Sequence, residues 1–327
     1  MITSYIKHLF PVLFILSLSS CFKSELPVPE HNPGNTITQT VNMGKDYRTC
    51  YYYSLQNNVV VSQNLKTDWD IAFEASTNGF HIFLNTGKSM FAMRTGKTSM
   101  SAITIDDTTG FGANKHWDSP KGEIDSTAIG DWRSGTGIYI LDRGYDVTGL
   151  PLGFEMLNIK SVSDSGYWVE FGAIGGGSTS QLFIKKDTTY NAMYLSFEGD
   201  GSIKSIEPPK HNWDIVFTQY TEVFYDPIMP YEVTGVLMNK CGITVAVDSL
   251  HSFEDLKSNN ISSLKFSTNI DAIGYSWKAY NGTKYTVNPR KCYVIKNAEN
   301  VLYKLHFIDF YDNAGNKGNP KWEMVRL

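Results

Sequence analysis

"TDWDIAF" (residues 67–73) and "HNWDIVF" (residues 211–217) are nearly the same seven residues, and one chain contains both. Their tryptophans, Trp69 and Trp213, lie 144 positions apart (213 − 69). A Trp-Asp dipeptide also occurs in propeller blades, but blades recur about every 40–45 residues. A spacing of 144 therefore indicates a repeat the size of a domain.

A second pair of segments recurs with the same offset. "AIGDW" (128–132) is followed 144 positions later by "AIGYSW" (272–277). A looser echo precedes the Trp-Asp segments, where "YYYSLQ" (51–56) resembles "MYLSFE" (193–198). Two anchors with one offset predict a diverged internal duplication.

Alternating and β-branched runs separated by Gly, Asn and Asp are typical of strands joined by tight turns. Aromatic residues, which suit half-buried pleated surfaces, make up 13% of the chain. One short helix is predicted, over residues 252–258. The predicted class is all-β with few short helices: antiparallel sheets built from two related halves. The clearest expected strands are 58–63, 79–85, 165–171, 231–238, 242–248 and 303–310.

The repeated Trp-Asp-Ile-x-Phe segment has a structural interpretation. On an extended strand, Trp69, Ile71 and Phe73 would share one face, and we expect that face to pack inward. Asp70 and Asp214 are expected to accept backbone N–H groups of an adjacent turn.

The N-terminus predicts an exported, lipidated protein. Residues 1–20 combine a short positive region with an apolar run too short to span a bilayer, which is typical of a signal peptide. "LSSC" ends at Cys21 and resembles a bacterial lipobox, so we expect acylation of Cys21; an ordinary secretory signal is the alternative. Residues 21–40 are expected to be a tether. The first β half is predicted over 41–190 and the second over 191–327, together forming one compact unit.

Several functional classes are not supported by the sequence. The net charge of −4 and the lack of a basic run argue against nucleic-acid binding. No catalytic motif is present, so no catalytic residue and no enzymatic activity are predicted. Cys50, Cys241 and Cys292 show no metal-binding spacing, so no metal site is predicted. A disulfide among these three cysteines stays open.

Segments spread over nearly the whole mature chain resemble the HmuY-like lipoproteins of Bacteroidetes. They include "WDIAF", "GKTSM" (96–100), "NWDIVF", "AIGYSWKAY" (272–280) and "YKLHFIDFYDNAGNKGNPKWE" (303–323). The resemblance implies an all-β fold, anchorage at the outer membrane or cell surface, and work beside a TonB-dependent transporter in iron acquisition. It also implies haem binding, since characterised members act as haemophores that hold haem with an axial pair of His or Met side chains.

The resemblance also indicates where the haem ligands of this chain would lie. One family ligand comes from the loop region before the Trp strand, which contains His116 in the first half and His251 in the second. The region of the second family ligand, 168–177 or 277–283, contains neither His nor Met. Met229, in a proline-flanked loop, is a further candidate. His116, His251 and Met229 are therefore the predicted cofactor-binding residues.

Two functions follow as expectations. The first is an extracytoplasmic lipoprotein that binds haem or a related porphyrin and supports its uptake. The second is a surface binding or accessory module with the same fold that recognises another ligand or a protein partner. A haemin titration separates them, because only the first predicts a saturable shift of the Soret band.

Overall fold

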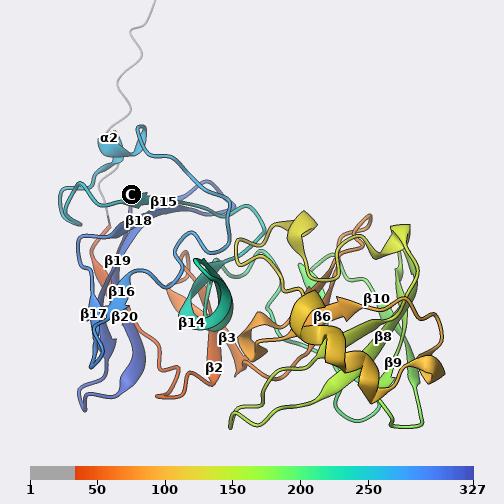
Figure 1. Ribbon diagram of the computed structural model, residues 1–327. Helices are drawn as coiled ribbons and strands as arrows, with labels where there is room; N and C mark the ends of the chain where they lie inside the picture. The colour runs from red at the N-terminus through yellow and green to blue at the C-terminus, as the bar shows by residue number, and fades with distance from the viewer. Residues whose placement is uncertain (1–33) are drawn as a thin grey trace, which may run out of the picture. The chain divides into compact units, whose positions relative to one another are not determined.

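Antiparallel β-sheets make up most of the chain, as predicted. The computed structural model describes residues 34–327. In that part of the chain the strands form four larger sheets and one small hairpin, β16 (Lys278–Tyr280) with β17 (Tyr285–Val287). Figure 1 shows β6, β8, β9 and β10 gathered in one group, and β2, β3 and β14 in another.

Two of these sheets form what we call the first sheet pair, because they share one apolar core. The four-stranded sheet has the order β12-β11-β4-β5, and the five-stranded sheet has the order β10-β9-β8-β7-β6. The strands are β4 (Ile71–Glu74), β5 (Ile82–Leu84), β6 (Phe91–Arg94), β7 (Tyr139–Asp142), β8 (Phe154–Ser163), β9 (Gly166–Ala173), β10 (Ser180–Lys185), β11 (Ala192–Ser196) and β12 (Ser202–Lys204).

The other two sheets form the second sheet pair, again around one core. Their orders are β3-β2-β13-β14 and β1-β20-β19-β18-β15. The strands are β1 (Ile37–Thr40), β2 (Thr49–Ser54), β3 (Val59–Leu65), β13 (Ile215–Tyr225), β14 (Ile228–Met238), β15 (Thr244–Asp248), β18 (Cys292–Lys296), β19 (Leu302–Tyr311) and β20 (Lys317–Arg326).

Helices are short. The described part of the chain has two α-helices, α1 (Phe111–Asn114) and α2 (Ser258–Ile261). It also has the 3-10 turns η1 (Thr86–Lys88), η2 (Met100–Ala102), η3 (Ile105–Gly110), η4 (Ile124–Ser126) and η5 (Trp132–Ser134). Over residues 34–327, no helix has the length and hydropathy that a membrane span requires.

The helix predicted over 252–258 was wrong, because α2 begins only at Ser258. The buried ammonium of Lys304 donates to the carbonyl oxygens of Phe253 and Leu256. Those are carbonyls that a continuous helix would need for its own backbone bonds.

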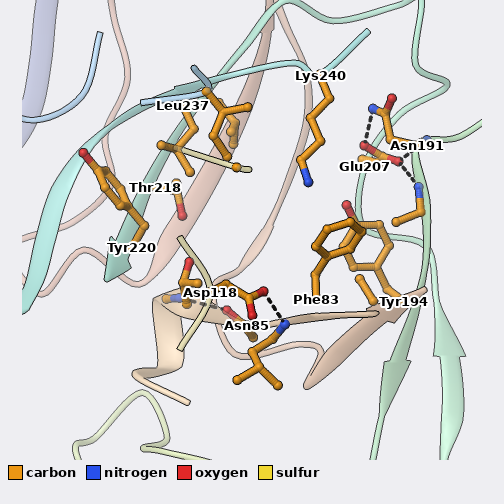
Figure 2. Close-up of a pocket in the computed structure, with 18 of the residues that line it drawn as sticks. Phe83, Asn85, Asp118, Asn191, Tyr194, Glu207, Thr218, Tyr220, Leu237 and Lys240 are labelled. Atoms are coloured by element: carbon orange, nitrogen blue, oxygen red, sulfur yellow. Dashed lines mark hydrogen bonds between the residues drawn. The ribbon is translucent and has the colours of Figure 1, made fainter. Parts of the chain in front are cut away.

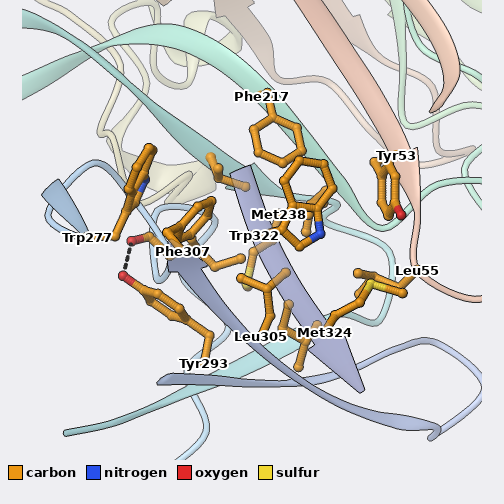
Figure 3. Packing of buried hydrophobic residues seen from close by; sticks show 14 of the residues in the cluster. Tyr53, Leu55, Phe217, Met238, Trp277, Tyr293, Leu305, Phe307, Trp322 and Met324 are labelled. Carbon is orange, nitrogen blue, oxygen red and sulfur yellow. Dashed lines mark hydrogen bonds between the residues drawn. The ribbon is translucent and has the colours of Figure 1, made fainter. Parts of the chain in front are cut away.

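Strand alternation explains the two cores. In β4, Ile71 and Phe73 point into the first core, and in β13, Ile215 and Phe217 point into the second; all four are fully buried. Figure 3 shows Phe217 beside Trp322 in the second core, where the ring centroids are 4.7 Å apart.

The prediction that Trp69 shares the face of Ile71 and Phe73 was wrong. Trp69 and Trp213 belong to a third apolar cluster instead, together with Tyr52 and Tyr194. Both tryptophans precede the strands, which begin at positions 71 and 215, so the two-residue alternation does not extend back to them.

The aspartates of the repeated segment have the predicted structural role. Asp70 accepts the backbone N–H of Phe197 at 2.8 Å, and Asp214 accepts that of Leu55 at 2.7 Å. Each acceptor therefore holds the turn that follows the neighbouring strand. In both segments the carboxylate accepts a backbone N–H, which explains why Asp recurs.

The Ala-Ile-Gly segment recurs because its glycine adopts a positive φ in both copies. Gly130 and Gly274 have φ of 61° and 63°, a region that favours glycine. The carbonyl before each glycine accepts a tyrosine hydroxyl: Tyr139 bonds Ile129 at 2.9 Å, and Tyr293 bonds Ile273 at 3.2 Å.

The two halves of the sequence exchange strands. β2 pairs with β13, so that Tyr53 lies opposite Ile215, and β11 pairs with β4, so that Leu195 lies opposite Ile71. The second strand before each Trp-Asp segment, β2 or β11, thus pairs with the strand that begins in the other segment. The boundary between the halves 41–190 and 191–327 stays a prediction about ancestry, and strands from both sides of it share sheets.

Candidate functional site

A cavity of about 390 Å³ lies between the two four-stranded sheets. Its volume falls in the range of small-molecule sites, roughly 300–1,000 Å³. The walls come from both sheet pairs, and the residues of Figure 2 line it. We call it the inter-sheet cavity.

The strand register sets the lining of the inter-sheet cavity. Tyr194 lies opposite Ala72 in the β11–β4 ladder, and Tyr52 lies opposite Val216 in the β2–β13 ladder. All four line the cavity. Their strand neighbours point into the two cores, so each strand contributes one face to a core and the other to the cavity.

Two aromatic pairs form matching walls. Trp69 meets Tyr194 edge to face, and Trp213 meets Tyr52 in the same way; both pairs of ring centroids are 4.9 Å apart. Such geometry is favoured by the aromatic quadrupole. The cavity therefore offers rigid apolar surface on two sides.

Lys240 brings a positive charge to this apolar space. Its Nζ lies 3.7 Å from the centroid of the Phe83 ring. Figure 2 shows the side chain extending between Leu237 and Thr218 on one side and Glu207 on the other. Lys240 keeps open surface, yet burial by the surrounding protein lowers its pKa, as expected where that surface faces a cavity.

The backbone that carries Lys240 is fixed by its neighbour. The Asn239 side chain donates to the carbonyls of Lys210 and Trp213 at 2.7 and 2.8 Å, and accepts the N–H of Cys241 at 2.9 Å. Asn239 is 1% exposed. The start of the Lys240 side chain is thus held in place.

Two buried carboxylates of the cavity are occupied by the protein itself. Asp118 accepts the N–H groups of Leu84 and Ala128, both at 2.8 Å. Glu207 accepts those of Asn191 and Ala192 at 2.6 and 3.0 Å. Burial raises the pKa of Asp118 to about 6 and also raises that of Glu207.

The inter-sheet cavity does not fit haem iron. None of the residues that line it is a histidine. Burial raises the pKa of the Cys50 thiol to about 11, and its Sγ lies 3.1 Å from the Thr218 hydroxyl. The one lining methionine, Met238, is 2% exposed and packs in the second core. Haem iron is held by an imidazole, a thiolate, a thioether or a phenolate. Burial raises the pKa of the lining phenols Tyr52, Tyr194 and Tyr220, which disfavours the phenolate form.

His116 lies outside the cavity, at the edge of the first sheet pair. Its backbone exchanges two hydrogen bonds with Ala92 of β6, at 2.9 and 2.8 Å. Its side chain is exposed, and no hydrogen bond to its ring is formed by residues 34–327. His116 is therefore an available imidazole on a fixed piece of backbone.

His251 and Met229 differ from His116. Both ring nitrogens of His251 have partners: Nδ1 lies 2.9 Å from Asp248 and Nε2 lies 3.3 Å from Asn260. Met229 is 44% exposed near the tip of the β13–β14 hairpin, opposite Phe224. Neither residue lines the inter-sheet cavity.

Other sequence expectations can be placed as well. Cys21 lies outside the described residues. Cys50, Cys241 and Cys292 have free thiols in the described part of the chain. Two further histidines are buried: His81 is 8% exposed and pairs with Glu74 at 2.6 Å, and His306 is 7% exposed and stacks on Phe253 with ring centroids 4.0 Å apart.

The inter-sheet cavity was not predictable from a sequence motif. Lys240 stands in "MNKCGI" without any motif, and Phe83 reads as an ordinary strand residue. The strand exchange brings these residues together from distant parts of the chain. The only signal was the recurrence of Trp beside Asp, which marks the two aromatic walls.

The fold and the cavity together define an all-β protein with a built ligand-sized space. The family described as HmuY protein matches residues 46–324. The chain therefore belongs to the HmuY family, as the resemblance indicated.

Three solved structures are similar to this chain at low sequence identity. Apo PinO from Porphyromonas gingivitis shares 10% identity, with 90% of this chain and 98% of that chain covered and a TM-score of 0.29. The apo HmuY analog of Tannerella forsythia shares 11%, with coverages of 91% and 99% and a TM-score of 0.25. A structure from Bacteroides vulgatus, titled as an HmuY-like heme binding protein, shares 12%, with coverages of 88% and 90% and a TM-score of 0.24. No curated protein matches the sequence.

Proposed function

We propose that this member of the HmuY family is an exported, lipid-anchored protein that binds haem or a related porphyrin and supports its uptake. The observation that carries the proposal is the family match over residues 46–324. No catalytic role is proposed for any residue, since the family is one of binding proteins.

His116 is the residue best placed to meet haem iron. Its imidazole is exposed and unengaged, whereas both nitrogens of His251 are held by neighbours. Haem iron accepts an axial imidazole or thioether, and Met229 offers an exposed thioether. Haem, when bound, would supply an iron atom that one of these side chains could coordinate.

A haemin titration of four proteins tests the proposal. We expect the wild-type protein to give a saturable, shifted Soret band. His116→Ala should weaken haemin binding at least tenfold, because an axial ligand is lost. His251→Ala should change it less than threefold and serves as the matched control, and Met229→Ala identifies a thioether ligand. A wild-type spectrum that equals free haemin at all ratios would overturn the proposal.

Anchorage and partnership belong to the same proposal. Acylation of Cys21 would hold the folded part at the outer membrane or cell surface, near a TonB-dependent transporter. Cys21→Ala is expected to move the protein from the membrane fraction to the soluble fraction. Unchanged membrane association of that variant would contradict lipidation at Cys21.

A second candidate function is favoured by the inter-sheet cavity. In this alternative the chain keeps the HmuY fold and binds another small molecule between its sheets. The specific observation is a ligand-sized space with aromatic walls and a lysine, placed away from His116, His251 and Met229. Binding of a non-porphyrin ligand without a haemin band would favour this function over the first.

A further inference from the structure

We propose that the inter-sheet cavity binds a small aromatic anion, whose carboxylate pairs with Lys240 and whose ring stacks among the aromatic walls. This inference rests on the second candidate function, ligand binding in the cavity, and names its ligand class. It is independent of haem binding at His116.

Lys240 has no polar partner among residues 34–327. No oxygen in that part of the chain lies within hydrogen-bond or ion-pair distance of its Nζ, and its close neighbour is the Phe83 ring, 3.7 Å away. Lys240 keeps exposed surface, yet the surrounding protein lowers its pKa, so an anion would compensate the ammonium. The cavity can therefore take a negative group beside Lys240.

The acids near Lys240 are already engaged. Both carboxylate oxygens of Asp118 accept backbone N–H groups, and Glu207 accepts two more. Lys66 and Lys210 also line the cavity. Lys66 is itself paired, with Gln219 at 2.5 Å and Glu232 at 2.6 Å. Lys240, whose Nζ lies over the Phe83 ring, is left for a ligand.

The two sides of the cavity match except at one position. Asn85 binds the carbonyls of Lys66 and Trp69, as Asn239 binds those of Lys210 and Trp213. The residue after Asn239 is Lys240, whereas the residue after Asn85 is Thr86. At this position only one copy carries a positive charge, so a ligand with one anionic end would have a defined orientation.

The apolar walls select the rest of the ligand. The two aromatic walls hold four rings at fixed angles, those of Trp69, Tyr194, Tyr52 and Trp213. The Phe83 ring lies beside the ammonium of Lys240. A flat aromatic ring buries apolar surface and meets these rings favourably. Burial lowers the pKa of Lys240, and a bound carboxylate would act in the opposite direction by stabilising the ammonium.

The test measures binding of 2-naphthoate and of the neutral 2-naphthalenemethanol to the purified protein by isothermal titration calorimetry. We expect saturable 1:1 binding of 2-naphthoate and at least tenfold weaker binding of the alcohol. Lys240→Met should weaken naphthoate at least tenfold and leave the alcohol unchanged. Lys240→Arg should stay within about threefold of wild type, because it keeps the charge.

The matched control is Lys185→Met, which removes the same charge from an exposed position of β10 outside the cavity. It should leave naphthoate binding unchanged. Equal naphthoate affinity in wild type and Lys240→Met, or no saturable binding to wild type, would overturn the inference.

Haemin titration of the same variants separates this inference from the haem proposal. Loss of naphthoate binding in Lys240→Met with an intact haemin band supports both. Naphthoate binding without any haemin band supports the cavity ligand and overturns haem binding. A haemin band without naphthoate binding overturns the cavity ligand alone.

Discussion

The two copies of the Trp-Asp segment place an aspartate in the same backbone setting but in different charge settings. The Asp70 carboxylate accepts the N–H of Phe197, and the Asp70 N–H donates to the carbonyl of Leu195. In the second copy the Asp214 carboxylate accepts the N–H of Leu55, and the Asp214 N–H donates to the carbonyl of Tyr53. Both side chains are buried, at 1% and 7% exposed.

The difference lies in the neighbours. Lys88 forms an ion pair with Asp70, and Arg143 adds two bonds of 3.2 Å. Lys88 lies three positions after Asn85, and the residue three positions after the equivalent Asn239 is Gly242. No ion pair to Asp214 is formed by residues 34–327, in contrast to the Lys88 pair with Asp70. Burial consequently raises the pKa of Asp214 to about 6. The local motif fixes the backbone bonds, while distant residues decide whether the charge is compensated.

The largest expected effect comes from Asp70→Asn. The change leaves Lys88 and Arg143 without their shared anion in the protein interior, which typically costs about 3–5 kcal/mol. Urea unfolding should show this loss in the free energy of unfolding. The double variant Asp70→Asn/Lys88→Met should recover part of it. A loss below about 1 kcal/mol in the single variant would contradict the role of this network.

A pair of asparagine variants should give an intermediate effect of equal size in both copies. Asn85→Ala and Asn239→Ala each free two backbone carbonyls and one N–H from a buried side-chain partner. We expect about 2–4 kcal/mol for each, since unpaired buried groups cost about 1–3 kcal/mol apiece. Unfolding energies that differ by more than about 2 kcal/mol would show that the two copies are not mechanically equivalent.

The smallest effect, with the opposite sign, is expected for Asp214→Asn. Because the folded pKa of about 6 exceeds the unfolded value near 4, protonation favours the folded state. That contribution is complete below about pH 4 and is lost as the pH rises through about 6. At pH 8 the variant should therefore be about 1–2 kcal/mol more stable than wild type, and at pH 4 the two should agree. Equal stability at both pH values would argue against a buried, uncompensated carboxylate.

Much of the fold was predictable from the sequence. Alternating runs and dense turns indicated antiparallel sheets, and the 144-residue offset correctly paired Asp70 with Asp214 and Gly130 with Gly274. These features are local, so they repeat wherever the segment repeats. The face of Trp69 was predicted wrongly, because strand β4 begins two residues later.

The site was less predictable, because it depends on contacts between distant residues. The sequence gives no sign that Lys88 and Arg143 meet Asp70, or that Lys240 meets Phe83. His116, His251 and Met229 stay predictions as haem ligands, and among them the structure gives His116 the free imidazole. A loop position can indicate a ligand, but only packing decides whether its side chain is already engaged.

The exchange of strands also governs the order in which the protein can be completed. A chain that emerges N-terminus first presents β1–β3 early, yet Tyr53 must wait for Ile215, and Ile37 for Met324 near the very end. The stretch from β4 to β12 has all its sheet partners within itself and can close first. Contacts this remote along the chain are slow to form. The leading strands thus keep an unpaired edge until their distant partners are in place, and the second core closes only when β20 joins it.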